Sequence, residues 1–97
     1  MRLRELKGLG PASEKQLAEV GIDSPEQLTD LGAIETFQRL LRQAEEAGSN
    51  PPSLNFLYAL VGALEDRHWI DIAQEEKYQL LMALEGYQEL EKQFNVD

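Results

Sequence analysis

Apolar residues recur along this chain at the three- and four-residue spacing of an α-helix, and no stretch keeps the alternation of a half-buried strand. Over residues 33–47 they form one stripe, which consists of Ile34, Phe37, Leu40, Leu41 and Ala44. Over residues 73–94 they form another stripe, which consists of Leu80, Leu81, Leu84, Tyr87, Leu90 and Phe94. Such a stripe is the buried face of an amphipathic helix. The pattern therefore predicts an all-α fold.

The segment from Leu54 to about Asp66 is apolar around nearly its whole circumference. A helix of this kind is central and is covered by its neighbours on several sides. Gly62 and Ala63 would let another backbone approach it closely, and Ser53 is expected to cap its N-terminus. Residues 67–72 are expected to turn the chain into the last helix.

Start and stop signals divide the rest of the chain. Pro11 suits the first position of a helix, where a missing N–H is harmless, and Gly21 suits its left-handed end. Ser24-Pro25-Glu26-Gln27 has the order of a capping box, and the short helix that it starts should end at Gly32. Residues 48–52, Gly-Ser-Asn-Pro-Pro, form a loop too short to link two domains. We expect a compact bundle of about five helices.

The small-apolar-small turn Gly8-Leu9-Gly10 is the most distinctive local motif. One helical turn precedes it and a helix follows it, which is the layout of a helix-hairpin-helix unit of SAM/HhH-like folds. In one interpretation Gly8, Leu9 and Gly10 bind a phosphate through backbone N–H groups, and Lys7 and Lys15 supply counter-charge. In the other, the glycines only make a tight turn and Leu9 fills the core.

The charge of the chain disfavours a polyanionic partner. Its 97 residues carry a net charge of −9, and all of this excess lies after residue 23. Most of the surface would repel a phosphate backbone, so that DNA could approach only the N-terminal tip, where Arg2, Arg4 and Lys7 lie. A protein partner is therefore expected, and DNA is the disfavoured alternative.

Composition excludes several classes of site and of protein. The chain has no cysteine and one histidine, so we expect no disulfide, no metal site and no cofactor. It has no run of about 18 apolar residues and no signal-peptide pattern, so we expect a cytoplasmic protein without a membrane segment. Its length predicts one domain over residues 1–97.

No catalytic constellation appears in the sequence. The adjacent carboxylate pairs, which are Glu45-Glu46, Glu65-Asp66 and Glu75-Glu76, point about 100° apart on a helix and do not converge. A catalytic triad would depend on His68 alone. We interpret His68 as a residue near a helix end that bonds the last carbonyls, with a pH-sensitive contact or a weak metal ligand as the alternatives, and Trp69 as a core residue. The sequence predicts no enzyme.

The last helix has a second, half-apolar side formed by Tyr78, Met82, Glu85 and Gln88. This side would contact a partner helix or a second copy of the chain. The alternative is an exposed helix with ordinary scattered apolar atoms. The sequence leaves the oligomeric state open.

The chain resembles the C-terminal domain of the TfoX (Sxy) family of bacterial competence regulators from about Leu3 to Leu84. The likeness rests on an ordered set of short motifs: Gly8-Leu9-Gly10-Pro11, Ser13-Glu14, Val20-Gly21-Ile22, Leu31-Gly32-Ala33, Ser53-Leu54-Asn55, Ala59-Leu60, Gly62-Ala63-Leu64 and His68-Trp69. The resemblance implies an all-helical domain of helix-hairpin-helix type with a regulatory role and no catalysis.

Full-length members of that family assist transcription of DNA-uptake genes alongside the cyclic-AMP receptor protein. The resemblance therefore implies a protein partner, either a TfoX N-terminal-type domain or a transcription factor. The 97 residues leave no room for the N-terminal α/β domain of full-length members. A stand-alone protein and a domain of a longer one are both compatible with this length, and a direct role in competence is not implied without the missing domain.

Overall fold

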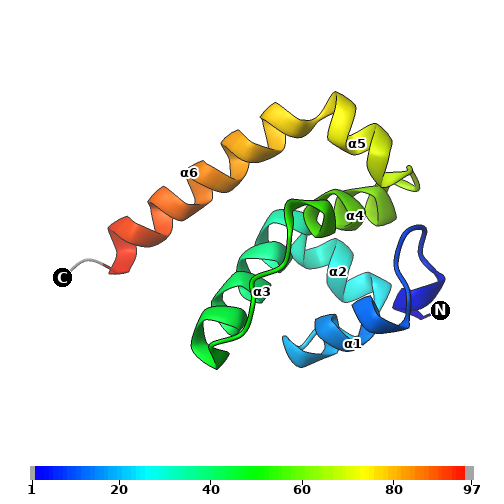
Figure 1. The fold of residues 1–97 in the computed structure, drawn as a ribbon, viewed down its shortest axis with the longest axis horizontal. Helices are drawn as coiled ribbons and strands as arrows, with labels where there is room; N and C mark the ends of the chain where they lie inside the picture. Colours follow the sequence, from blue (N-terminus) through cyan, green and yellow to red (C-terminus); the bar gives the residue numbers. More distant parts are fainter. Residues whose placement is uncertain (1, 96–97) are drawn as a thin grey trace.

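Helices form the body of the protein in the computed structural model, which describes the backbone of residues 2–95 and the side chains of residues 2–86 (Figure 1). A 3-10 helix (Leu3–Glu5) leads to six α-helices: α1 (Pro11–Glu19), α2 (Pro25–Leu31), α3 (Ala33–Ala47), α4 (Leu54–Glu65), α5 (Trp69–Glu75) and α6 (Lys77–Asn95). Residues 2–95 contain no strand. The prediction of an all-α fold is confirmed, with one helix more than expected.

The first half of the chain follows its start and stop signals. The Gln27 N–H donates to the Ser24 hydroxyl at 3.2 Å, and the Gln27 side-chain oxygen accepts the N–H of Asp23 at 2.7 Å. Gly32, at φ 85°, is at once the residue after α2 and the residue before α3. A single glycine therefore joins these two helices.

The expected cap at Ser53 is wrong. Its side chain makes no capping hydrogen bond to α4. In a capped helix the Phe56 N–H would donate to the Ser53 hydroxyl. Here it donates to the Ser53 carbonyl at 3.0 Å instead. A tight backbone turn has therefore replaced the side-chain cap.

Helix α4 is the centre of the core, in contact with both α3 and α5. Leu57 and Leu60 are fully buried in it, as predicted for a helix that is apolar on most sides. A Cβ atom placed on Gly62 would lie 2.4 Å from the Arg67 carbonyl oxygen. The predicted close backbone approach at Gly62 is confirmed.

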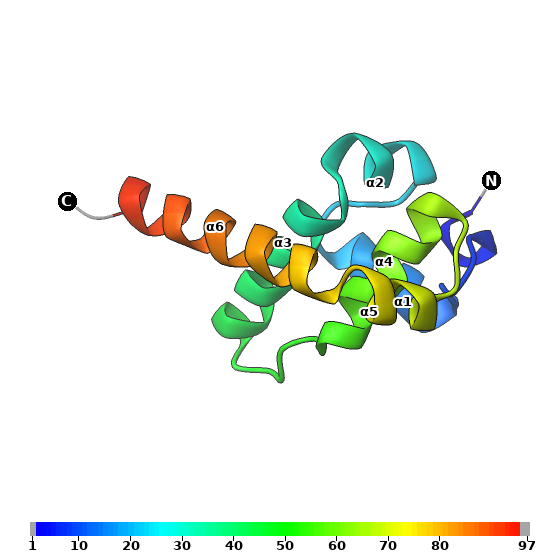
Figure 2. The same cartoon turned by 90° about the horizontal axis from the view of Figure 1, so that it is seen from above.

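The C-terminal part differs from the predicted single helix over residues 73–94. Helix α5 already begins at Trp69, within the segment expected to turn the chain, and a bend at Glu76 separates it from α6. Both views show α6 leaving the body of the protein, with its C-terminal half extending beyond α3 (Figures 1 and 2). At the bend Glu76 has φ −121° and ψ 6°, outside the helical region.

The predicted inward stripe of the last helix is described in its first half. Leu84 is buried, and Leu80 and Leu81 are half-buried. The side chains of Tyr87, Leu90 and Phe94 lie outside the described residues. Within residues 2–95, no helix combines the length and the apolar character that a membrane span requires.

Candidate functional site

The hairpin between the 3-10 helix and α1 is the first candidate site. Gly8 has φ 83°, in the left-handed region that favours glycine, and the Leu9 N–H donates to the Leu6 carbonyl at 3.1 Å. Leu9 is only 6 % exposed and belongs to the core cluster. The interpretation of Leu9 as a core residue is therefore confirmed, while phosphate binding by the hairpin stays a prediction.

The outer surface of the hairpin is open. Lys7 and Lys15 are exposed, and a Cβ atom on Gly8 or Gly10 would have no heavy atom within 4 Å. Helix α1 starts at Pro11, which has no N–H to offer, so the first donors of its N-terminus belong to later residues.

An ion pair occupies the side of this hairpin. The Arg4 guanidinium donates to Glu14 Oε1 from Nη2 at 2.8 Å and from Nε at 3.0 Å, and the Arg4 backbone N–H donates to Oε2 at 3.2 Å. These hydrogen bonds hold the pKa of Glu14 below its usual value and raise the pKa of Arg4. Arg4, one of the three cations expected at the N-terminal tip, is thus already paired with a carboxylate.

The outer side of α6 is the second candidate site. Tyr78 is 80 % exposed and Met82, one helical turn later, is 71 % exposed. Glu85 is exposed on the following turn, and the side chain of Gln88 lies outside the described residues. The structure thus brings two large apolar side chains together on the surface, and contact with a partner stays a prediction.

His68 and Trp69 differ from their sequence-based interpretation. His68 precedes α5 and caps its N-terminus, because the Ile70 N–H donates to His68 Nδ1 at 3.2 Å. His68 therefore serves the start of a helix, where the free N–H groups need an acceptor, and not the end of one as predicted. Trp69 is 36 % exposed, because Ile72 occupies the inward position of this short helix.

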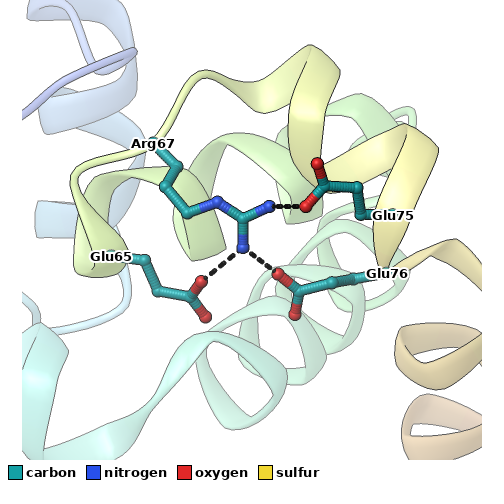
Figure 3. A network of polar contacts seen from close by, with 4 residues as sticks. All are labelled: Glu65, Arg67, Glu75 and Glu76. Carbon is teal, nitrogen blue, oxygen red and sulfur yellow. Dashed lines mark hydrogen bonds and ion pairs between the residues drawn. The ribbon is translucent and has the colours of Figure 1, made fainter.

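Arg67 is a residue that the sequence analysis missed. Its Nη1 donates to Glu65 Oε1 at 2.9 Å, and the same guanidinium binds the carboxylates of Glu75 and Glu76 (Figure 3). Hydrogen bonding to Glu65 raises the pKa of Arg67. The partners are two, eight and nine residues away across a loop, so no helical spacing reveals them.

An open groove lies between the end of α1 and α3. It is lined by Val20, Glu35, Arg39, Arg42, Gln43 and Glu46. Its charges are mixed, and Arg39 lies 3.7 Å from Glu35 one turn away on the same helix. Among the side chains of residues 2–86, no three His, Asp or Glu groups are arranged to hold a metal ion.

Comparisons with known proteins identify the family. The model of the TfoX C-terminal domain matches residues 1–84. A crystal structure of an uncharacterized protein from Listeria monocytogenes, in a triclinic form, is similar to this chain with a TM-score of 0.71. The two are 30 % identical, and the match covers 91 % of this chain and 94 % of that one. No curated protein matches the chain. The chain belongs to the TfoX C-terminal domain family, a regulatory and non-catalytic type of domain.

Proposed function

We propose that this domain acts in bacterial transcription and competence regulation by binding another protein through the outer side of α6. The observation that carries the proposal is the exposure of Tyr78 and Met82 on adjacent turns of this helix. Burying one large apolar side chain contributes about 1.5–3 kcal/mol, so two neighbours can anchor a helix or a groove of a partner.

The charge of the domain indicates what kind of protein would bind. The chain carries a net charge of −9, and Glu85 lies exposed next to the two apolar side chains. A basic partner would be attracted over a distance and oriented by this field, whereas an acidic one would be repelled. Membership of the family supports a TfoX N-terminal-type domain or a transcription factor as this partner.

Calorimetric titration of the domain with a purified TfoX N-terminal domain tests the proposal. The double variant Tyr78→Ser/Met82→Ser should weaken binding at least tenfold, because it removes both apolar anchors. The variant Ala47→Ser, at the exposed end of α3, is the matched control and should bind like the wild type. Equal affinity of the double variant and the control would contradict the proposal for α6.

The hairpin supports a second candidate function, non-specific binding of DNA. The observation in its favour is the open space around Gly8 and Gly10, flanked by the exposed Lys7 and Lys15. A duplex should then be retarded at low salt, and the effect should fade steeply as salt rises.

Gly10→Glu is the sharpest variant for this second function. Gly10 has φ −126°, which any residue adopts, so the substitution places a negative charge on the hairpin without backbone strain. Retardation by the wild type that is lost in Gly10→Glu would favour DNA binding. Retardation that persists in Gly10→Glu, or that is absent from the wild type at low salt, would exclude the hairpin.

A further inference from the structure

The bend between α5 and α6 has no cause in the local sequence. It lies at Glu76, between Glu75 and Lys77, and all three are good helix formers. Sharp bends usually occur at proline, glycine or serine, and none of these lies within α5 or at the bend. The Glu76 N–H still bonds the Ile72 carbonyl at 2.8 Å, and its carbonyl accepts the Leu80 N–H at 2.9 Å. These two bonds span the bend, while Glu76 itself, at φ −121° and ψ 6°, departs from helical geometry and interrupts the helix.

Contacts outside the helix must hold the bend. The guanidinium of Arg67 binds Glu65 at the end of α4, Glu75 at the end of α5, and Glu76 in the bend (Figure 3). One cation thus ties the direction of α6 to the central helix. Without it, the three carboxylates would lie close together and repel one another.

A second contact holds α6 near its beginning. Helix α6 touches α3, and in its described part Leu80 is half-buried and Leu84 is 8 % exposed. Beyond this contact both views show the helix extending past the other elements (Figures 1 and 2). Helix α6 is therefore attached to the body by its first turns and by the bend.

The side of α3 that α6 covers can be identified by elimination. Phe37, Leu40 and Ala44 form the core side of α3, and Arg39 lies on a second side near α1 and α2. The third side contains Gln38, with Ile34 and Leu41 one turn before and after it. Ile34 and Leu41 are half-buried, and Gln38 is 3 % exposed. Among the main neighbours of α3 in the described part of the chain, α6 is the one not yet placed on another side, and it carries apolar side chains that can cover them.

The covered side contains an unfavourable feature. The Nε2 amide nitrogen of Gln38 is buried and makes no hydrogen bond within the described part of the chain. A buried donor without a partner opposes the state that buries it, because water would bond it in the open state. The contact between α6 and α3 is consequently weaker than its apolar side chains alone would make it.

We infer that α6 is a hinged cover for α3, that Glu76 is its hinge, and that Arg67 is the latch. In the closed state Arg67 holds the bend and α6 lies on the Gln38 side of α3. In the open state α5 and α6 join into one straight helix. This opening uncovers Leu80, Leu84 and the side of α3 that contains Gln38. The inference is independent of the proposed partner, since opening takes place within the chain itself.

The distance between α3 and α6 tests this inference directly. The chain has no cysteine, so the substitutions Ala47→Cys and Glu85→Cys place two spin labels specifically at exposed positions. Glu85 lies about 13 Å beyond the hinge along α6, so straightening should lengthen the distance by several ångströms. Pulsed electron-spin resonance on the full chain should give mainly one short distance in the otherwise unchanged protein.

Variants of the latch should populate the open state. Arg67→Gln should add a longer-distance population, and Glu76→Gln should add a smaller one. Sodium chloride at 1 M, which shortens the screening length to about 3 Å, should do the same without any substitution at the latch. Arg4→Gln is the matched control, because it breaks another Arg–Glu pair that involves no residue of α5 or α6, and it should leave the distance unchanged.

Two results would overturn the inference. The first is a distance distribution that stays unchanged in both Arg67→Gln and Glu76→Gln. If the circular dichroism of Arg67→Gln shows that this variant does not fold, then Glu76→Gln and the salt titration decide. The second is a lower melting temperature for Gln38→Met, which removes the unpaired amide at similar volume and should raise the melting temperature and favour the short distance.

Discussion

The N-terminal and C-terminal parts of this domain reach their helical structure in different ways. From α1 to α3, each boundary lies at a residue whose local chemistry ends or starts a helix, such as Ser24, Gly21 or Gly32. From α5 to α6, the boundary falls among good helix formers and depends on Arg67, which is distant in sequence. Local signals can therefore be strong in one part of a small domain and silent in another.

The largest expected effect concerns the core that both parts share. Leu60→Ala in α4, at a fully buried position, should lower the free energy of unfolding by roughly 2–5 kcal/mol. Urea denaturation followed by circular dichroism measures this loss. A transition in two steps would show that the N-terminal and C-terminal parts unfold separately. They would then be two independent units and not one cooperative core.

Gly62→Ala tests the attachment of the C-terminal part. The added Cβ atom would lie 2.4 Å from the Arg67 carbonyl oxygen, so the backbone must shift, and we expect a loss of about 1–3 kcal/mol in the free energy of unfolding. Gly86→Ala is the control, because that position is helical and has no heavy atom within 4 Å. The control should stabilise the protein by roughly 0.5–1 kcal/mol, and equal effects of the two variants would argue against the close approach.

Ser24→Ala tests the local signals of the N-terminal part. Loss of the bond from the Gln27 N–H should lower the free energy of unfolding by about 1 kcal/mol. Ser53→Ala is the matched control, because the Ser53 side chain makes no capping bond, and it should change the free energy much less. A greater loss in Ser53→Ala would mean that α4 depends on the side chain of the residue before its first turn.

The smallest expected effect is the dependence of stability on pH through Glu14. Its pKa lies below the ordinary value of about 4.3 because Arg4 bonds the carboxylate, so the folded state binds its proton less readily than the unfolded state. The pair therefore stabilises the fold above about pH 4.3, and this contribution is lost as the pH falls through the lowered pKa.

Melting temperatures between pH 3 and pH 7 measure this effect. In Glu14→Gln the melting temperature should fall slightly less steeply below about pH 4.3 than in the wild type. Arg4 is exposed and Glu14 is partly exposed, so water screens the pair and the difference should be small. A parallel decline in the two proteins would show that the pair makes no net contribution.

The sequence predicted the all-α class and the bounds of α2 and α3, because capping residues and the apolar stripe act within one or two turns. It failed at Trp69, since the start of α5 depends on the cap at His68. It also failed at Glu76, where a long-range ion pair overrides helix propensity. Tertiary contacts of this kind leave no periodic pattern in a single sequence.

The sequence predicted some features of the candidate sites and missed one residue. Helical spacing placed Tyr78 and Met82 on one side of a helix, and both proved highly exposed. The small-apolar-small pattern predicted a tight turn, and Leu9 proved to be part of the core. Arg67 was missed, because its three carboxylate partners come from two helices and a bend whose arrangement only the folded chain reveals.

The joint at Gly32 constrains how this domain can change its length. Gly32, with φ 85°, follows the last residue of α2 and precedes the first residue of α3, so no loop separates the two helices. An insertion there would shift Phe37 and Leu40 out of register with α4. The segment over residues 50–52, beyond the left-handed Gly48 and the bond from the Ser49 N–H to the Ala44 carbonyl, has no such constraint. Length variation among relatives should therefore gather in that segment and spare the joint.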